Sequence, residues 1–153
     1  MKNPIKFGSD GWRAIIADAF TFENVRRAAL ATAEYFKTVE GREPAVFVGF
    51  DVRFQSQAFA RAAAETLAAS GFRIIMLDRP YPTPYVSFEV RRRNFAGGIM
   101  ITASHNPPAF NGFKVKAHFG GSATPAITAK IEEAVARGFQ DGRNQLDLSN
   151  TSP

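Results

Sequence analysis

Short β-type segments alternate with amphipathic helical segments along the chain, and this alternation limits the folds that it can adopt. The β-type runs are rich in Val, Ile, Phe or Met and are bounded by Gly, Pro or Asp, as strands usually are. They cover residues 45–50, 73–77, 97–102 and 113–117, and 14–17 is a weaker candidate. Parallel strands need crossover connections, so helices placed between strands favour a largely parallel sheet.

Two intervals between these runs have helical periodicity. Apolar residues recur on one face of 22–36, behind Thr21 as a possible N-cap. The same spacing occurs in 59–68, behind Ser56 as a second candidate N-cap.

Two further helices are predicted from Thr-Pro pairs at 83–84 and 124–125, which place an N-cap threonine before an N1 proline. The last helix is expected to close at Gly138. We therefore expect an α/β fold, a three-layer α/β/α sandwich with a mixed, mostly parallel sheet of about four strands. The link 102–113 has no room for a crossover helix, so the last strand should be antiparallel.

The chain is long enough for one domain, which we place at residues 1–139, and the polar stretch 140–153 is predicted to be a linker or tail. Cysteine is absent, which excludes disulfides and thiolate metal sites. No apolar run approaches the roughly 20 residues that cross a bilayer, and no signal-type segment opens the chain. These features predict a cytoplasmic protein without a membrane partner. The net charge of +5 favours anionic partners.

A polar loop, Thr-Ala-Ser-His-Asn-Pro-Pro, follows the apolar run 97–102. Ligands of such sheets bind at the carboxyl ends of strands. Ser104 lies in this loop, which its two prolines stiffen. A positioned hydroxyl suits a covalent nucleophile or phosphate carrier, although a turn serine with a local backbone bond has the same appearance. His105 could orient a phosphate or be a solvated loop histidine.

Asn111-Gly112 suits a tight turn, and the strand predicted after it carries Lys114 and Lys116 on one face. Two crowded ammonium groups lower each other's pKa, which suits proton transfer near neutral pH. A solvated lysine pair on an edge strand is the competing interpretation.

Two other loops combine acidic and basic residues. "FGSDGWRA" (7–14) contains glycines that permit close backbone approach, and Arg13 in it could bind phosphate through two donors. "GFDVRFQS" (49–56) has Asp51 and Arg53 at a strand end, where a structural ion pair is the expected arrangement.

Taken in order, these segments resemble the α-D-phosphohexomutase family, which includes phosphoglucomutase and phosphomannomutase. "TASHNPPAFNGFKV" (102–115) is similar to the family's phosphoserine loop, and "FGSDGWR" is similar to its N-terminal arginine loop. "GFDVRFQS" and "PTP" (82–84) also fall where its first domain has them. The resemblance covers about residues 5–138. Ala14 and Ser9 depart from the family's more usual glycine and threonine.

The resemblance implies that Ser104 carries a phosphate, donates it to a hexose phosphate through a 1,6-bisphosphate intermediate, and receives the other phosphate back. It also implies that Lys114 is the general acid/base, that Arg13 assists it and that His105 positions sugar or phosphate. The further candidate contacts to substrate or phosphate are Ser9, Asn106 and Lys116.

By the same resemblance, the full enzyme uses Mg²⁺ and is activated by glucose or mannose 1,6-bisphosphate. The metal would be held by the phosphate on Ser104 and by three aspartates of a D-x-D-x-D motif in a second domain, a spacing that is absent here. We therefore expect a first-domain fragment, inactive or nearly so alone, whose partners are a hexose phosphate and the remaining domains of its polypeptide.

Two other functions compete with this one. The arginine run 91–93 could belong to a non-catalytic basic module that binds anions or nucleic acid, but it lacks interleaved aromatic residues, so we expect no nucleic-acid partner. An acyl-transfer site at Ser104 would need a G-x-S-x-G elbow, which is missing, and His105 is too close in sequence to serve easily as its base.

Overall fold

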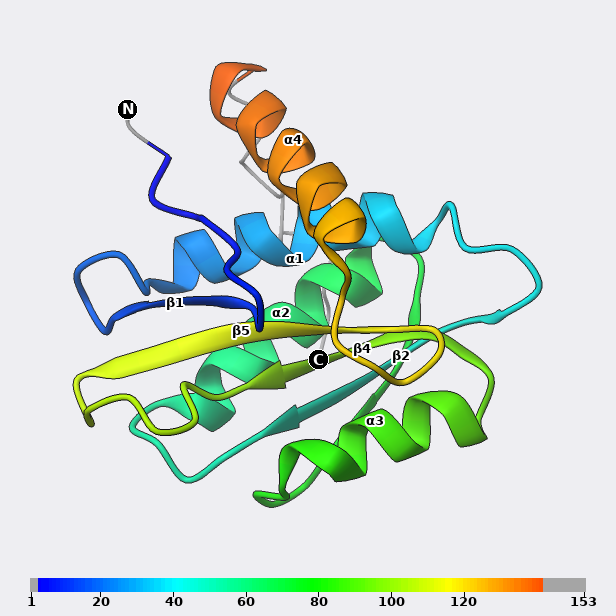
Figure 1. Ribbon diagram of the computed structural model, residues 1–153, viewed down its shortest axis with the longest axis horizontal. Coiled ribbons are helices and arrows are strands. Elements are labelled where there is room, and N and C mark those ends of the chain that lie inside the picture. Colours follow the sequence, from blue (N-terminus) through cyan, green and yellow to red (C-terminus); the bar gives the residue numbers. More distant parts are fainter. Residues whose placement is uncertain (1–2, 142–153) are drawn as a thin grey trace.

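The apolar runs form one mixed sheet in the order β1-β5-β4-β2-β3 (Figure 1). The computed structural model describes residues 3–141. The strands are β1 Trp12–Ile15, β2 Glu43–Phe50, β3 Arg73–Met76, β4 Phe95–Ile101 and β5 Phe110–Ala117.

The directions of the strands confirm a mostly parallel sheet with an antiparallel last strand. β2 is parallel to both β3 and β4, whereas β5 is antiparallel to β4 and to β1. Every strand except β5 therefore runs in the same direction. The sheet has five strands and not about four. The fifth strand lies at Trp12–Ile15, so the weak candidate at 14–17 only overlaps it, and it pairs along β5 from Trp12↔Phe113 to Ile15↔Phe110.

Helices cover both faces of the sheet, which confirms the three-layer arrangement. They are α1 Phe22–Phe36, α2 Ser56–Ala69, α3 Thr83–Arg92 and α4 Pro125–Asp141. α1 and α2 lie on one face and α3 lies on the other, while α4 packs against the outer side of α1 (Figure 1). Among the described residues, none of these helices is long and apolar enough to cross a bilayer.

The first two helices begin differently from one another. Thr21 caps α1 as predicted, since its hydroxyl accepts a hydrogen bond from the backbone N–H of Asn24. The prediction that Ser56 is the N-cap of α2 is wrong. Gln55 occupies that position, and the Ser56 hydroxyl donates to the Asp51 carboxylate at 2.7 Å. The hydroxyl at this helix start therefore stabilises a loop and not the helix end.

The later helices are placed as predicted, with shifts at their ends. The N-cap of α3 is Pro82, one residue before the threonine that was expected there. α4 passes through Gly138 and continues to Asp141, so the helix is longer than predicted. The tail 142–153 lies outside the described residues, and the division at residue 139 stays a prediction.

Apolar side chains fill both interfaces between the sheet and its helices. On the side of α1 and α2 the largest buried side chains include Trp12, Phe20 and Phe36. On the side of α3, Phe47 and Met100 pack with helix side chains. Burial of this apolar surface holds the sheet between its two helical layers.

Asn111-Gly112 forms no turn, contrary to the prediction. Both residues lie inside β5, where they pair with Ala14 and Arg13 of β1. A Cβ on Gly112 would lie 2.4 Å from the Thr102 carbonyl oxygen, so only glycine allows β5 to approach the end of β4 this closely. This close approach places the polar loop beside β1.

We predict that Gly112→Ala destabilises the fold by about 1–3 kcal/mol, because the atoms nearest the added Cβ include backbone that cannot move aside cheaply. Gly8→Ala is the matched control, since its Cβ would find its nearest neighbour at 3.7 Å and should change stability by no more than about 0.5 kcal/mol. Urea unfolding of the two variants measures the difference. Equal midpoints would contradict the prediction.

Candidate functional site

The polar loop between β4 and β5 holds Ser104 in an unusual backbone conformation. Ser104 has a φ of 52°, in the left-handed region, which costs a residue other than glycine about 1–3 kcal/mol. Its N–H donates to the Thr102 hydroxyl at 3.0 Å, and the next turn is closed by Asn106 N–H to the Ala103 carbonyl. Ser104 is an exposed residue. Surrounding bonds therefore maintain a strained residue at a strand end.

Lys114 lies on β5 directly beside this hydroxyl. Its Nζ donates to Ser104 Oγ at 2.9 Å and to Asp10 Oδ2 at 2.5 Å. Lys114 is only 4% exposed, because β5 lies between β4 and β1 and not at an edge of the sheet. The alternative of a solvated lysine pair on an edge strand is therefore wrong.

Lys116 is buried on the same face but does not reach Ser104. Its Nζ donates to the Ser122 hydroxyl at 3.1 Å, and that hydroxyl donates to Asp10 Oδ1 at 3.1 Å. The pKa of Lys116 is lowered, chiefly by burial, with the charge of Lys114 acting in the same direction and that of Asp10 opposing it. Sequence reasoning placed Lys116 correctly on one face with Lys114 but did not foresee Ser122.

Asp10 connects the two lysines. Burial alone raises its pKa, but the hydrogen bond and charge of Lys114, the bond from Ser122 and the charge of Lys116 together lower it below 3.8. The sequence indicated an acidic residue in this loop but assigned it no role, because its lysine partners are more than 100 positions away in the chain.

Arg13 reaches the loop from β1. Its Nη1 donates to Asn106 Oδ1 at 2.6 Å, and its Nη2 lies 3.6 Å from Asp10 Oδ2. The pairing of Arg13 with Gly112 sets this position, so the β1–β5 register determines where the guanidinium lies. The structure therefore brings Arg13, Asn106, Lys114 and Ser104 into one set of contacts.

An open hollow of about 460 Å³ lies next to these contacts. Three predicted site residues, Ser9, Arg13 and His105, contribute to its wall. The remaining lining residues are Lys6, Gly8, Asp10 and Gly11. Cations and glycine backbone predominate, so the hollow suits an anionic ligand.

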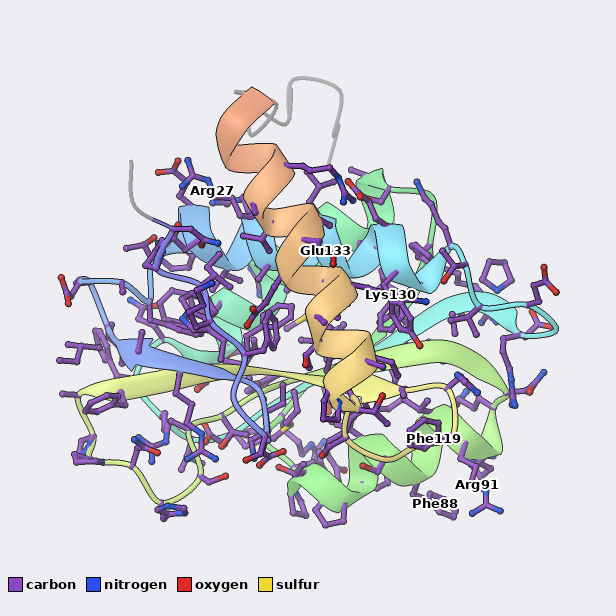
Figure 2. All side chains as sticks on the ribbon, turned by 45° about the horizontal axis from the view of Figure 1, so that its top comes forward. Arg27, Phe88, Arg91, Phe119, Lys130 and Glu133 are labelled. Atoms are coloured by element: carbon purple, nitrogen blue, oxygen red, sulfur yellow. The ribbon has the colours of Figure 1, made fainter. Side chains whose placement is uncertain are left out.

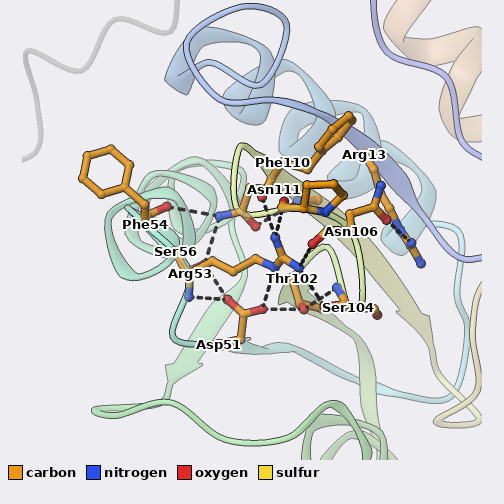
Figure 3. A network of polar contacts seen from close by, with 12 residues as sticks. Arg13, Asp51, Arg53, Phe54, Ser56, Thr102, Ser104, Asn106, Phe110 and Asn111 are labelled. Atoms are coloured by element: carbon orange, nitrogen blue, oxygen red, sulfur yellow. Dashed lines mark hydrogen bonds and ion pairs between the residues drawn. The ribbon is translucent and has the colours of Figure 1, made fainter.

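The Asp51–Arg53 segment does more than form the predicted ion pair. Arg53 Nε lies 3.5 Å from Asp51 Oδ2, as that prediction required. Figure 3 shows the guanidinium also bonded to the loop that carries Ser104, to four backbone carbonyl oxygens. The acceptors belong to Ser104, Asn106, Pro107 and Phe110.

The arginine run at the end of α3 is partly neutralised within the domain. Arg92 and Arg93 both bond to the buried carboxylate of Glu89, whose pKa is lowered first by the Arg92 hydrogen bond. Arg91 is exposed on the outer side of α3 near Phe88 (Figure 2). Arg92 and Arg93 therefore pair with a carboxylate of the same helix.

Carboxylates and histidines do not gather into a metal site in the described part of the chain, where no group of three or more His, Cys, Asp or Glu could hold an ion. Asp10 and Asp51 already accept bonds from lysine, hydroxyl or arginine groups.

The fold and the site define an α/β/α domain that presents an exposed, cation-flanked serine at the carboxyl end of a parallel strand. Residues 4–141 match the family model for phosphoglucomutase/phosphomannomutase, alpha/beta/alpha domain I. The chain belongs to this family and corresponds to its domain I.

Individual relatives agree with the family model. The chain is 40% identical over 124 residues to a probable phosphomannomutase of Haemophilus influenzae, covering 76% of this chain and 25% of that protein. It is 37% identical over 138 residues to a phosphoglucomutase of Staphylococcus saprophyticus, covering 86% of this chain and 24% of that one.

A solved structure supports the same relationship. The crystal structure of a putative phosphomannomutase from Thermus thermophilus superposes with a TM-score of 0.82 at 43% identity, covering 88% of this chain and 30% of the other. The chain thus spans about a quarter of the length of the curated relatives that it matches.

We predict that Lys114→Met raises the pKa of Asp10, because the main lowering influences are removed while burial continues to raise it. The folded-state pKa of Asp10 is depressed, so its contribution to stability is present above pH 3.8 and is lost as the pH falls through the folded value. Carboxyl ¹³C NMR titration of the 153-residue chain measures the shift.

Lys130→Met is the control for this titration. Lys130 lies on α4 beside α1 (Figure 2) and lines a different surface depression, with Glu34 and Tyr35. An Asp10 pKa that moves equally in both variants would show that Lys114 has no specific effect.

Proposed function

We propose that the chain is the phosphoserine-bearing domain of a phosphohexomutase and that Ser104 carries the transferred phosphate. The observation that carries the proposal is the bond from Lys114 Nζ to Ser104 Oγ, with Asp10 held on the same ammonium group. A buried proton donor aimed at the hydroxyl of an exposed serine suits a group that repeatedly gains and loses a phosphoryl group.

In the first step, a hydroxyl oxygen of a hexose phosphate attacks phosphorus on phosphorylated Ser104. The bond from phosphorus to Ser104 Oγ breaks, a bond to the sugar oxygen forms, and the proton of the sugar hydroxyl passes through Lys114 to Ser104 Oγ. The resulting bisphosphate turns over and returns its other phosphoryl group to the serine. The net reaction is an isomerisation by two phosphoryl transfers.

The other site residues have supporting roles in this proposal. Arg13 stabilises charge on the transferring group and assists Lys114. His105 and Ser9 contact the sugar or its phosphate from the wall of the hollow. Asn106 holds the Arg13 guanidinium, to which its side-chain oxygen is already bonded.

Lys116 acts through charge and not through contact with Ser104. Its ammonium is linked to Asp10 by way of Ser122. This adds positive charge behind the hollow, where a phosphorylated ligand would bring negative charge.

The described residues 3–141 do not by themselves form a site for Mg²⁺. We propose that the phosphate on Ser104 provides a metal ligand and that aspartates elsewhere in a longer polypeptide provide the others. Magnesium would supply charge stabilisation for the phosphoryl group. The site residues Asp10 and Asp51 are not proposed as ligands because lysine, arginine and hydroxyl groups already bond to them.

The substrate is proposed to be a hexose phosphate, with glucose or mannose 1,6-bisphosphate as the activator. Two curated relatives are named for different sugars, so the described residues leave the choice of hexose open. The chain spans about a quarter of these relatives, and we propose that it needs the remaining domains of its polypeptide for activity.

We predict that the complete protein, incubated with glucose 1,6-bisphosphate, gains one phosphate on the peptide that contains Ser104, and that Ser104→Ala abolishes this gain. Lys114→Met should slow the transfer by about 10²–10⁴-fold, because a positioned acid/base group is lost. Mass spectrometry of the digested protein locates the phosphate.

Ser70→Ala serves as the control, since Ser70 lies at the end of α2 and bonds to the Thr66 carbonyl oxygen. Phosphate on any residue other than Ser104 would defeat the assignment. Tight, steeply salt-dependent binding of RNA without phosphate uptake would favour the basic-module alternative instead.

A further inference from the structure

Arg53 bonds to both arms of the loop that carries Ser104. Its Nη2 donates to the carbonyl oxygens of Ser104 at 2.7 Å and Asn106 at 2.5 Å. Its Nη1 donates to the carbonyl oxygens of Pro107 at 2.9 Å and Phe110 at 3.0 Å. One planar group therefore spans the loop from its first turn to the start of β5.

Asp51 holds Arg53 in place from the other side. The Asp51 carboxylate accepts bonds from the backbone N–H of Arg53 at 3.0 Å, from Ser56 Oγ at 2.7 Å and from Thr102 Oγ1 at 2.6 Å. The Arg53 side chain is only 13% exposed, so water competes only weakly for its hydrogen-bond donors. The segment between β2 and α2 and the end of β4 thus form one bonded unit (Figure 3).

This unit forms hydrogen bonds to the backbone of Ser104 on both sides of its Cα atom. The Ser104 N–H donates to Thr102 Oγ1, which itself donates to Asp51, and the Ser104 carbonyl oxygen accepts from Arg53. A left-handed serine is disfavoured on its own, so it persists only where outside contacts determine both flanking peptides. Those contacts also determine the direction in which Oγ leaves the backbone.

We propose that Arg53 is a positioning residue, which keeps Ser104 left-handed and so holds Oγ against Lys114 Nζ. The effect of Arg53 on catalysis rests on the proposed function, whereas the effect of Arg53 on the conformation of the loop does not. Arg53 touches no substrate atom in this role and acts through the backbone of Ser104.

The chemistry of the side chain explains why an arginine is needed. Its guanidinium presents five N–H donors in a fixed plane, so its two terminal nitrogens can serve separate pairs of carbonyl oxygens. A lysine ammonium is a single point with three donors and cannot span the loop. Because the peptide after Ser104 is trans, the carbonyl bond to Arg53 also turns the His105 N–H to the opposite side.

The first test uses NMR on the 153-residue chain and compares Arg53→Lys with Arg42→Lys. Arg42 bonds to the Asn94 side chain at the opposite end of β4, so it controls for the loss of a guanidinium. In Arg53→Lys, we expect the ¹³Cα and ¹³Cβ shifts of Ser104 to leave their left-handed values and the amides of 104–106 and 109–111 to exchange faster. Loop shifts and exchange rates that match the wild type would overturn the proposal.

Thr102→Val is the second variant, and it keeps the test informative if Arg53→Lys folds poorly. It removes the hydroxyl that connects Ser104 to Asp51 and leaves Arg53 intact. We expect the ¹³Cα and ¹³Cβ shifts of Ser104 to move in the same direction as in Arg53→Lys, but by a smaller amount. Unchanged ¹³C shifts of Ser104 in Thr102→Val would contradict the inference that bonds on both sides of Ser104 maintain its conformation.

The catalytic consequence is measured on the complete protein. Arg53→Lys should lower kcat by about 100-fold with KM within about two-fold, since displacement of the serine by about 1 Å affects the reaction and not substrate binding. Added guanidinium should partly restore kcat of Arg53→Ala, and methylammonium should not. Unchanged kcat, or equal rescue by both cations, would overturn the positioning role.

The two tests separate failure of this inference from failure of the proposed function. If the wild-type complete protein shows no phosphate uptake at Ser104, the proposed function fails, and the NMR comparison still decides whether Arg53 holds the loop. If the wild type is active and the Arg53 variants keep both kcat and the Ser104 signals, only the positioning inference fails.

Discussion

The buried ammonium of Lys114 is the constraint on which the site depends. An unpaired charge in the interior of a sheet is strongly unfavourable, so Lys114 requires partners that it cannot find on its own strand. Asp10 provides the charge and Ser104 Oγ provides an acceptor. The N-terminal loop must fold over β5 to bring Asp10 there, and β1 then continues along the same strand and delivers Arg13. The requirement to pair one charge thus brings together segments about 100 residues apart.

The alternation of strands and helices was readable from the sequence because hydrophobic period and boundary residues are local signals. The missing crossover helix after residue 102 correctly predicted an antiparallel last strand. Long-range pairing left no such local signal. The N-terminal strand forms at 12–15, two residues before the weak candidate at 14–17, because it pairs with β5 there. Asn111-Gly112 is part of β5 although the pair has the composition of a turn. The Ser56 hydroxyl likewise went to Asp51 and not to its helix.

The site was also predictable only in part, because local signals mark some of its residues and long-range contacts place the others. Strand alternation put Lys114 and Lys116 on one face, which the structure confirms, but could not tell a central strand from an edge. For Ser104 the local composition left a turn serine as an open alternative, and the ordered set of motifs favoured a phosphate carrier, which stays a prediction. Arg53 was read as an ion-pair partner because its acceptors are backbone carbonyl oxygens, which every residue has and which the sequence therefore does not mark. A bond between two side chains can be anticipated from the residue types in the sequence, whereas a bond from a side chain to the backbone can hardly be anticipated at all.

In the proposed function, the arrangement separates two tasks that a phosphate-carrying serine would have to combine. Lys114, Asp10 and Arg13 lie on the side of the loop that borders the hollow, where charge would change as a phosphoryl group moves. Arg53 and Asp51 lie behind the loop and bond to its backbone, so their contacts need not alter when the ligand does. In the proposed reaction the same hydroxyl gives a phosphoryl group to one sugar oxygen and takes another back, with the ligand reversed between the steps. A loop that adapted to each orientation would lose the alignment that both transfers require. The stiffness therefore has to come from the domain that carries the serine, and the bonds from Arg53 to the loop supply it without occupying the face that the ligand needs.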